Sequence, residues 1–338
     1  MFRVNNQKGT TLVELMMSVT ISGLIIFVAM SFFGRSQAVF TQVDVNNTMK
    51  TNGQREIGRL SRVISLNKRI FSGGSANDLA FLARINFGSD PVPKASSKLP
   101  QISVSGVLSP NESGFDPQIF GNSLFFATFG QPVVAINILD SSGAAHNVRI
   151  DTYSFQYYYI NLSQNQAFRG QGGRNRLVGW HSQPYADYSQ ISRLTDTVEK
   201  ENLVIYLYNA GYRFAWLPSA AQVTNAFFRI NSNGTTPAHS THLITKGSIE
   251  FPLDVVTGVS GWSFPVGIAF NSGPSFAIKI PVPVFAQANN DFPGGLEIAV
   301  TGANTGRKIF MRLVLASQAS TGLQSYEHIN MTTVRDCW

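Results

Sequence analysis

The chain has 338 residues, enough for one large domain or two ordinary ones. Its net charge is +7, yet charged residues make up only 13% of the chain, against about 25% in an average soluble domain. There is no dense lysine and arginine block, so the charge gives no support for a specific nucleic-acid partner. The single cysteine, Cys337, excludes an intrachain disulfide.

The first predicted element is an apolar helix near the N-terminus. It follows a short polar stretch with two basic residues, and residues 15–34 carry no charge. Residues 12–33 supply the roughly 20 apolar residues that a helix needs to cross a bilayer. The preceding basic residues favour a cytoplasmic N-terminus. Residues 34–39 make a poor secretory cleavage site, so we expect the segment to be retained.

Glu14 is the one charged residue inside this apolar segment. A carboxylate deep in a spanning helix costs about 2.5–3.5 kcal/mol on insertion scales, and such residues usually mark a function. In the first turn of the helix, the same carboxylate would only complement the helix dipole, for about 0.3–1 kcal/mol. The residues alone leave both interpretations open.

The polar leader, Gly9, and Thr11-Leu12-Val13-Glu14 ahead of an apolar helix resemble the processing signal of type IV prepilins and pseudopilins. The resemblance implies that residues 1–9 are a leader peptide. It implies that a prepilin peptidase cuts after Gly9 and methylates the new amino terminus at Thr10, where the family usually has Phe. It also implies that Glu14 meets the amino terminus of a neighbouring subunit, because pairing offsets much of the cost of burying each charge.

The helical pattern continues past the apolar segment, so residues 10–68 are predicted to form one helical spine. Apolar residues recur at spacings of three and four up to about Leu66, opposite a polar face. Gly34 and Gly53 are expected to loosen this helix, each at about 1 kcal/mol relative to Ala. Residues 71–75 follow as a break rich in Gly and Ser.

Residues 69–338 are predicted to form a β-rich head, because short aromatic and β-branched runs alternate there with Gly, Pro, Asn and Ser. The predicted strands are residues 79–85, 102–107, 123–129, 133–139, 146–161, 203–208, 212–216, 227–230, 242–251, 276–280, 296–301 and 308–316. Residues 140–143 and 209–211 are predicted to be hairpin turns.

The expected fold class is α+β. A sheet must bury one face, and the second half of the long N-terminal helix is the natural cover for it. The result is a spine, membrane-spanning in its first half, packed on a large antiparallel head, an architecture similar to that of pilins. Whether the head is one unit or two, with a break near residues 193–202, stays open.

Two stretches could carry binding chemistry. Residues 169–176 hold three arginines among glycines, which indicates a flexible, solvated loop more than a phosphate-binding loop. Trp180, Tyr185 and Tyr188 would form either an exposed aromatic surface or ordinary packing under a loop.

Metal sites find little support. His239 and His242 lie close in sequence, but a zinc site needs three or four ligands. Residues 289–291 with Glu297 are rich in the oxygen ligands that calcium prefers, although the adjacent Pro-Gly-Gly indicates a plain turn. We expect no metal, no cofactor and no catalytic set.

The resemblance therefore predicts a minor type IV pilin at or near the pilus tip, which primes assembly or presents an adhesive surface. The expected partners are the prepilin peptidase, other major and minor pilins, and the inner membrane before assembly. The head would be periplasmic or extracellular. A type II secretion pseudopilin is one alternative. An N-anchored envelope binding protein that does not join a filament is another.

Overall fold

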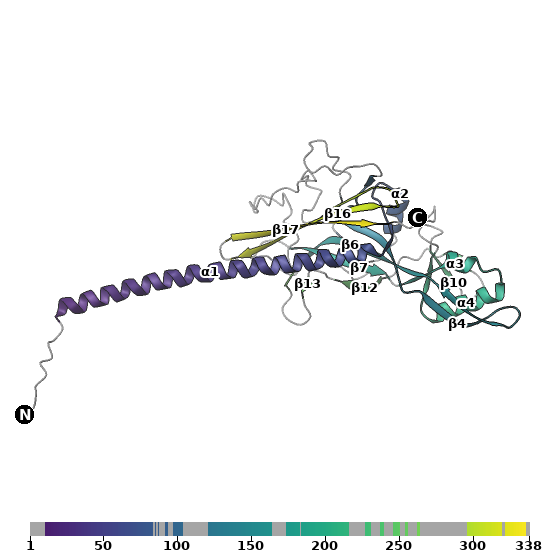
Figure 1. Ribbon diagram of the computed structural model, residues 1–338, viewed down its shortest axis with the longest axis horizontal. Helices are drawn as coiled ribbons and strands as arrows, with labels where there is room; N and C mark the ends of the chain where they lie inside the picture. The colour runs from purple at the N-terminus through teal and green to yellow at the C-terminus, as the bar shows by residue number, and fades with distance from the viewer. Residues whose placement is uncertain are drawn as a thin grey trace, which may run out of the picture.

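The structure, a computed structural model, describes part of the chain. The described residues are 11–83, 85, 87, 92–93, 97–103, 121–163, 174–182, 184–215, 227–230, 237–239, 246–250, 254–255, 262–263, 296–319 and 322–335. Within them the fold is α+β, with one long N-terminal helix and a head of mostly antiparallel sheets. Figure 1 shows the helix leaving the head as a single rod, with its amino end farthest from the head.

Helix α1, Leu12–Ser65, contains 54 residues. Its fully buried residues all lie in its second part, which packs on the head: Met49, Asn52, Gly53, Glu56, Ile57, Leu60 and Ile64. The helix ends at Ser65, one residue before the Leu66 to which the helical pattern was predicted to run. Strand β1 follows directly, so the break at residues 71–75 does not end the helix.

The other elements follow in chain order. Their bounds are β1 Asn67–Ile70, α2 Ala76–Leu82, β2 Ile102–Ser103, β3 Leu124–Phe129, β4 Val133–Leu139, β5 Ala145–Ile150, β6 Thr152–Ser163, β7 Arg174–Ser182, β8 Tyr185–Asp187, α3 Tyr188–Ser192, α4 Thr197–Asn209, β9 Arg213–Ala215, β10 Phe227–Ile230, β11 Pro237–His239, β12 Lys246–Glu250, β13 Asp254–Val255, β14 Trp262–Ser263, β15 Leu296–Thr301, β16 Arg307–Ala319 and β17 Gly322–Val334.

Two sheets organise the head. The larger has nine strands, in the order β1-β3-β6-β8-β9-β10-β11, with β7 paired to β6 and β12 paired to β7. The smaller has the order β17-β16-β15-β2. Among the strand pairs that the structure describes, β8–β9 and β15–β2 are parallel and the others are antiparallel. An isolated bridge between Gly121 and Ile298 connects the segment before β3 to β15.

The first core lies where α1 packs on both sheets. Met49, Ile57, Leu60 and Ile64 of α1 share one buried cluster with apolar residues of β15 and β16 and with one face of β3 and β6. The helix contacts β17, β16 and β3. The second half of α1 therefore covers a sheet face, as the sequence predicted.

Gly53 has a specific role in this contact. A Cβ added there would lie 2.8 Å from Cε1 of Tyr326 on β17, so the glycine lets helix and strand approach closely. The close packing against Tyr326 thus offsets the cost of a glycine inside a helix. No local sequence pattern predicts this contact.

The second core covers the opposite face of the large sheet. Leu124 and Phe126 of β3 face the first core, whereas Phe125 and Ala127 face the second, as the two-residue period of a strand requires. Phe71 stacks on Phe125 with ring centroids 4.5 Å apart. The short helix α2 closes this core with Phe81.

We call β4, β5, α3 and α4 the distal module. A third core is built from these elements together with Ala186 of β8. Its buried residues are Ala135, Ile138, Ile150, Ala186, Tyr188, Ile191, Leu203, Val204 and Leu207. Elements β4, α3 and α4 lie at the end of the head farthest from the N-terminus (Figure 1). The predicted turn at residues 140–143 is confirmed, with Gly143 at a φ of 82° where glycine is favoured.

Two predicted strands are wrong. Residues 79–85 fall largely in helix α2, and residues 203–208 lie in helix α4. In each case a polar N-cap begins a helix: the side chain of Ser75 accepts from the N–H of Asp78, and Asp196 accepts from that of Glu199. Short apolar runs fit both the helical and the strand spacing of apolar residues. In these two segments the N-caps favour a helix.

Two further predictions are corrected, and a third is not tested. Residues 209–211 end α4 and do not form a hairpin. The predicted strand 146–161 is two strands, β5 and β6, separated at Asp151, whose backbone carbonyl accepts from the N–H of Asp187 at 3.0 Å. The predicted strand 276–280 lies outside the described residues.

Candidate functional site

The amino end of α1 is capped by its own side chains. Thr11 is the N-cap, and its hydroxyl oxygen accepts from the backbone N–H of Glu14 at 3.3 Å. The Glu14 carboxylate accepts from the backbone N–H of Thr11 at 3.0 Å. Together they form a capping box, which satisfies two donors at the helix start. In the single chain, Glu14 therefore acts as a helix cap in the first turn.

The Glu14 side chain is exposed. A carboxylate has about four lone-pair sites, so the bond from Thr11 leaves capacity for a further donor. Gly9 and Thr10 lie outside the described residues.

The apolar part of α1 is uncovered. Among the described residues, α1 is the one helix that is long and apolar enough to span a membrane, and its most apolar stretch is not buried at all. Leu12 and Phe27 are each 75% exposed. Exposed apolar surface on this scale marks a site that contacts a membrane or another protein.

Trp180, Tyr185 and Tyr188 do not form an exposed aromatic surface. Trp180 and Tyr185 lie in the second core, and Tyr188 lies in the distal module, all of them buried. Of the two interpretations, ordinary packing is therefore confirmed for these three residues. Of the predicted basic loop, residues 174–176 belong to β7, while residues 169–173 lie outside the described residues.

The metal candidates do not come together in the part of the chain that is described. His239 is the last residue of β11, whereas His242 and residues 289–291 lie outside the described residues. Glu297 is buried, and its carboxylate accepts a hydrogen bond from Nη1 of Arg312 at 3.0 Å. The described residues contain no group of three or more His, Cys, Asp or Glu side chains that could hold a metal.

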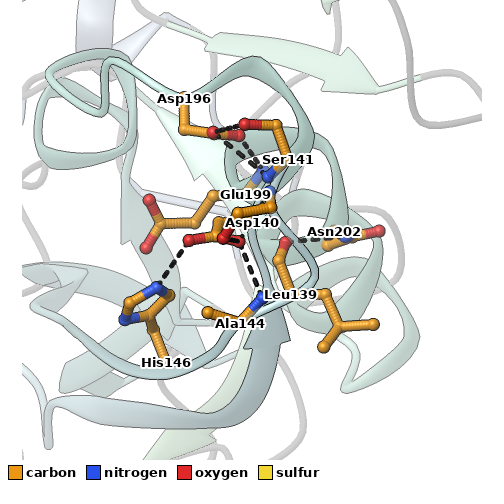
Figure 2. Close-up of polar contacts among 9 residues, drawn as sticks. Leu139, Asp140, Ser141, Ala144, His146, Asp196, Glu199 and Asn202 are labelled. Atoms are coloured by element: carbon orange, nitrogen blue, oxygen red, sulfur yellow. Dashed lines mark hydrogen bonds and ion pairs between the residues drawn. The ribbon is translucent and has the colours of Figure 1, made fainter.

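Sequence reasoning missed a polar cluster in the distal module, shown in Figure 2. Asp140 accepts from the backbone N–H groups of Ser142 and Ala144, at 2.9 and 2.8 Å. Its other carboxylate oxygen lies 2.9 Å from Nε2 of His146. Asp196, the N-cap of α4, accepts from the backbone N–H of Ser141 at 3.1 Å.

These contacts join the β4–β5 hairpin to α4, since Asn202 also donates to the Leu139 carbonyl at 2.9 Å. The cluster is thus structural. Residues 203–208 were predicted to be a strand. On that prediction there was no reason to expect a helix, α4, beside the turn at residues 140–143.

The cluster predicts a pH-dependent contact. The hydrogen bond to Asp140 raises the pKa of His146 above 6.5, with charge attraction to Asp140, Glu199 and Asp196 adding to it. Hydrogen bonds from Ser142, His146 and Ala144 lower the pKa of Asp140. The His146 contribution to stability is full below its unfolded pKa and is lost as pH rises through the raised pKa. The Asp140 contribution is full above pH 3.8 and is lost as pH falls through the lowered pKa.

We therefore expect Asp140→Asn to return the pKa of His146 toward 6.5, measured by NMR titration of its ring protons. Asp196→Asn is the matched control and should cause a smaller fall, because Asp196 acts on His146 only through charge at longer range. An unchanged His146 titration in Asp140→Asn would contradict the contact.

Comparison with known proteins identifies no relative: no family model, no curated protein and no solved structure matches the chain. The functional argument therefore rests on the residues and on their placement.

Proposed function

We propose that this chain is a minor type IV pilin, a structural subunit at or near the pilus tip. Its leader, residues 1–9, stays in the cytoplasm while residues 12–33 cross the inner membrane. A prepilin peptidase removes the leader after Gly9 and methylates Thr10. The subunit then leaves the membrane laterally and joins other pilins through α1, with its head periplasmic or extracellular.

The observation that carries this proposal is the uncovered apolar part of α1 together with its one carboxylate. The apolar stretch is unburied in the single chain, so it needs a membrane or neighbouring helices as cover. In a plain membrane anchor, Glu14 would serve only as a cap of its own helix. It also follows Val13 directly, in the stretch that resembles the processing signal. In a filament, neighbouring helices would cover the apolar part of α1, and the amino terminus of a neighbouring subunit would pair with the Glu14 carboxylate.

The capping box suggests how the two stages are linked. Before assembly, Glu14 caps its own helix by accepting from the Thr11 N–H. After cleavage, the methylated amino terminus of a neighbouring subunit would become a stronger partner, since bonds between charged groups are roughly twice as strong as neutral ones. Pairing would then select one axial register between adjacent helices.

The shape of the head supports a tip position. A bulky head fits poorly along a closely packed shaft but is accommodated at an end. The distal module lies at the end of the head farthest from the N-terminus, so a tip subunit would present it outward (Figure 1).

The test is the amino-terminal residue of the mature protein, read by mass spectrometry from the native host. We expect N-methylated Thr10. Gly9→Ala should abolish cleavage and leave residues 1–9 attached. Gly34→Ala is the matched control, because a Cβ there meets nothing within 4 Å, and it should be processed normally. An intact initiator methionine in the unaltered protein, with the peptidase present, would refute the proposal.

The two alternatives are separated by a deletion strain. Loss of pili supports the minor pilin, whereas loss of type II secretion with intact pili indicates a pseudopilin. Absence of the protein from purified filaments of both kinds would indicate an N-anchored envelope binding protein.

A further inference from the structure

The distal module contains an open hollow of about 500 Å³. One wall is the end of β5 and the other is α3 with the two residues after it. Arg149 lines the first wall and Arg193 the second. Its volume falls within the range of 300–1,000 Å³ that is typical of small-molecule sites.

In the described part of the chain, the side chains of the two arginines stabilise no other contact. Both are exposed, and neither side chain has a hydrogen bond or an ion pair with another described residue. A guanidinium presents several N–H donors in a planar fork that matches a carboxylate. Two such groups at the border of one hollow are suited to an anionic ligand.

Asp151 and Gln190 also line the hollow. The side chains of Asp151 and Gln190 are tied together: the Gln190 amide donates to the Asp151 carboxylate at 2.7 Å, and its carbonyl oxygen accepts from the Asp151 backbone N–H at 2.8 Å. This pair joins the β5–β6 junction to α3, so the two walls keep their spacing. It also offers acceptor and donor groups to ligand hydroxyls.

Apolar residues complete the lining. Val148 and Leu194 are half-buried, and both border the hollow. They offer apolar surface to the C–H face of a sugar ring, while the polar pair addresses its hydroxyl groups.

We propose that this hollow binds an acidic saccharide, with Arg149 and Arg193 holding the carboxylate. A free inorganic anion would use the arginines alone and leave the apolar surface and the Asp151–Gln190 pair without a role. The proposal rests on the hollow and not on filament membership, so it stands or falls separately from the function proposed above.

The test uses the full chain in detergent micelles with three probes: a galacturonic acid trisaccharide, the neutral galactose trisaccharide and inorganic phosphate. Binding is followed by saturation-transfer difference NMR and titration calorimetry. We expect the acidic trisaccharide to bind at least about tenfold more tightly than either other probe. Arg149→Gln and Arg193→Gln should each weaken it by about 10- to 100-fold, as the loss of a hydrogen bond to a charged group predicts.

Two further variants sharpen the result. Arg193→Lys keeps the charge but not the fork, so its loss should be smaller than that of Arg193→Gln. Arg335→Gln removes an exposed arginine outside the hollow and should bind the acidic trisaccharide like the unaltered chain. All four arginine variants should keep the thermal midpoint of the parent.

The proposal is overturned by any of four results, of which three concern the saccharides and the variants. They are no binding of the acidic trisaccharide, equal binding of the neutral one, and unchanged affinity in both glutamine variants. Phosphate binding as tight as the acidic trisaccharide would show a simple anion site and overturn it as well.

Discussion

A Glu14→Ala chain is expected to lose its leader normally and yet to be nearly absent from filaments. In an assembled filament, its removal would leave a neighbouring subunit's buried ammonium without a counter-charge. Removing one partner of a buried ion pair typically costs about 3–5 kcal/mol, which corresponds to at least a 100-fold loss of incorporation. The measurement compares the variant's amount in sheared filaments with its amount in membranes, by immunoblot.

Thr11→Ala is the control that separates assembly from capping. Thr11 and Glu14 form one capping box, so a purely local role would make the two variants behave alike. Removing an N-cap hydroxyl costs about 0.5–2 kcal/mol of helix stability but leaves the carboxylate available. We expect Thr11→Ala to enter filaments at close to the parent level. Equal recovery of the two variants in filaments would show that Glu14 acts only as a cap of its own helix.

The second large effect concerns the pair between Arg312 on β16 and Glu297 on β15. The two residues lie directly opposite in the sheet, with Nη1 to Oε2 at 3.0 Å and side chains only 2% and 1% exposed. We expect Arg312→Leu to destabilise the head by about 3–5 kcal/mol, because Glu297 stays buried without that charge partner. At about 2–4 °C per kcal/mol, the midpoint should fall by roughly 6–20 °C in calorimetry of the full chain in micelles.

The double variant Arg312→Leu/Glu297→Leu tests the reason for that loss. Replacing a buried pair by apolar residues of similar volume is often nearly neutral, so the double variant should recover most of the lost stability. A double variant as unstable as Arg312→Leu would show that packing around the arginine, and not the unpaired carboxylate, sets the cost.

The long helix and much of the sheet structure could be predicted because apolar residues repeat at a characteristic spacing in each kind of element. Leu60 and Ile64 repeat at helical spacing and are both buried. Residues 124–129, 133–139 and 296–301 are strands as expected. Long segments of consistent pattern leave few alternatives, since each position repeats the same signal.

The two strand predictions that are wrong fall where the pattern of apolar residues is short. Residues 203–208 contain β-branched and aromatic side chains that suit a strand, yet Leu203, Val204 and Leu207 form one buried face of α4. That face exists because the β4–β5 hairpin lies against it. The cap at Asp196 was readable in the sequence, but its effect depended on this packing.

By itself, the sequence determined that the chain begins with an apolar helix of spanning length, with one carboxylate near its start, and that a strand-rich segment follows. These features depend on local period and composition, which need no knowledge of distant residues. Only the tertiary structure decided that Gly53 meets Tyr326 and that Arg149 and Arg193 share one hollow. Those pairings join residues 44 or more positions apart, so folding and not local pattern brings them together.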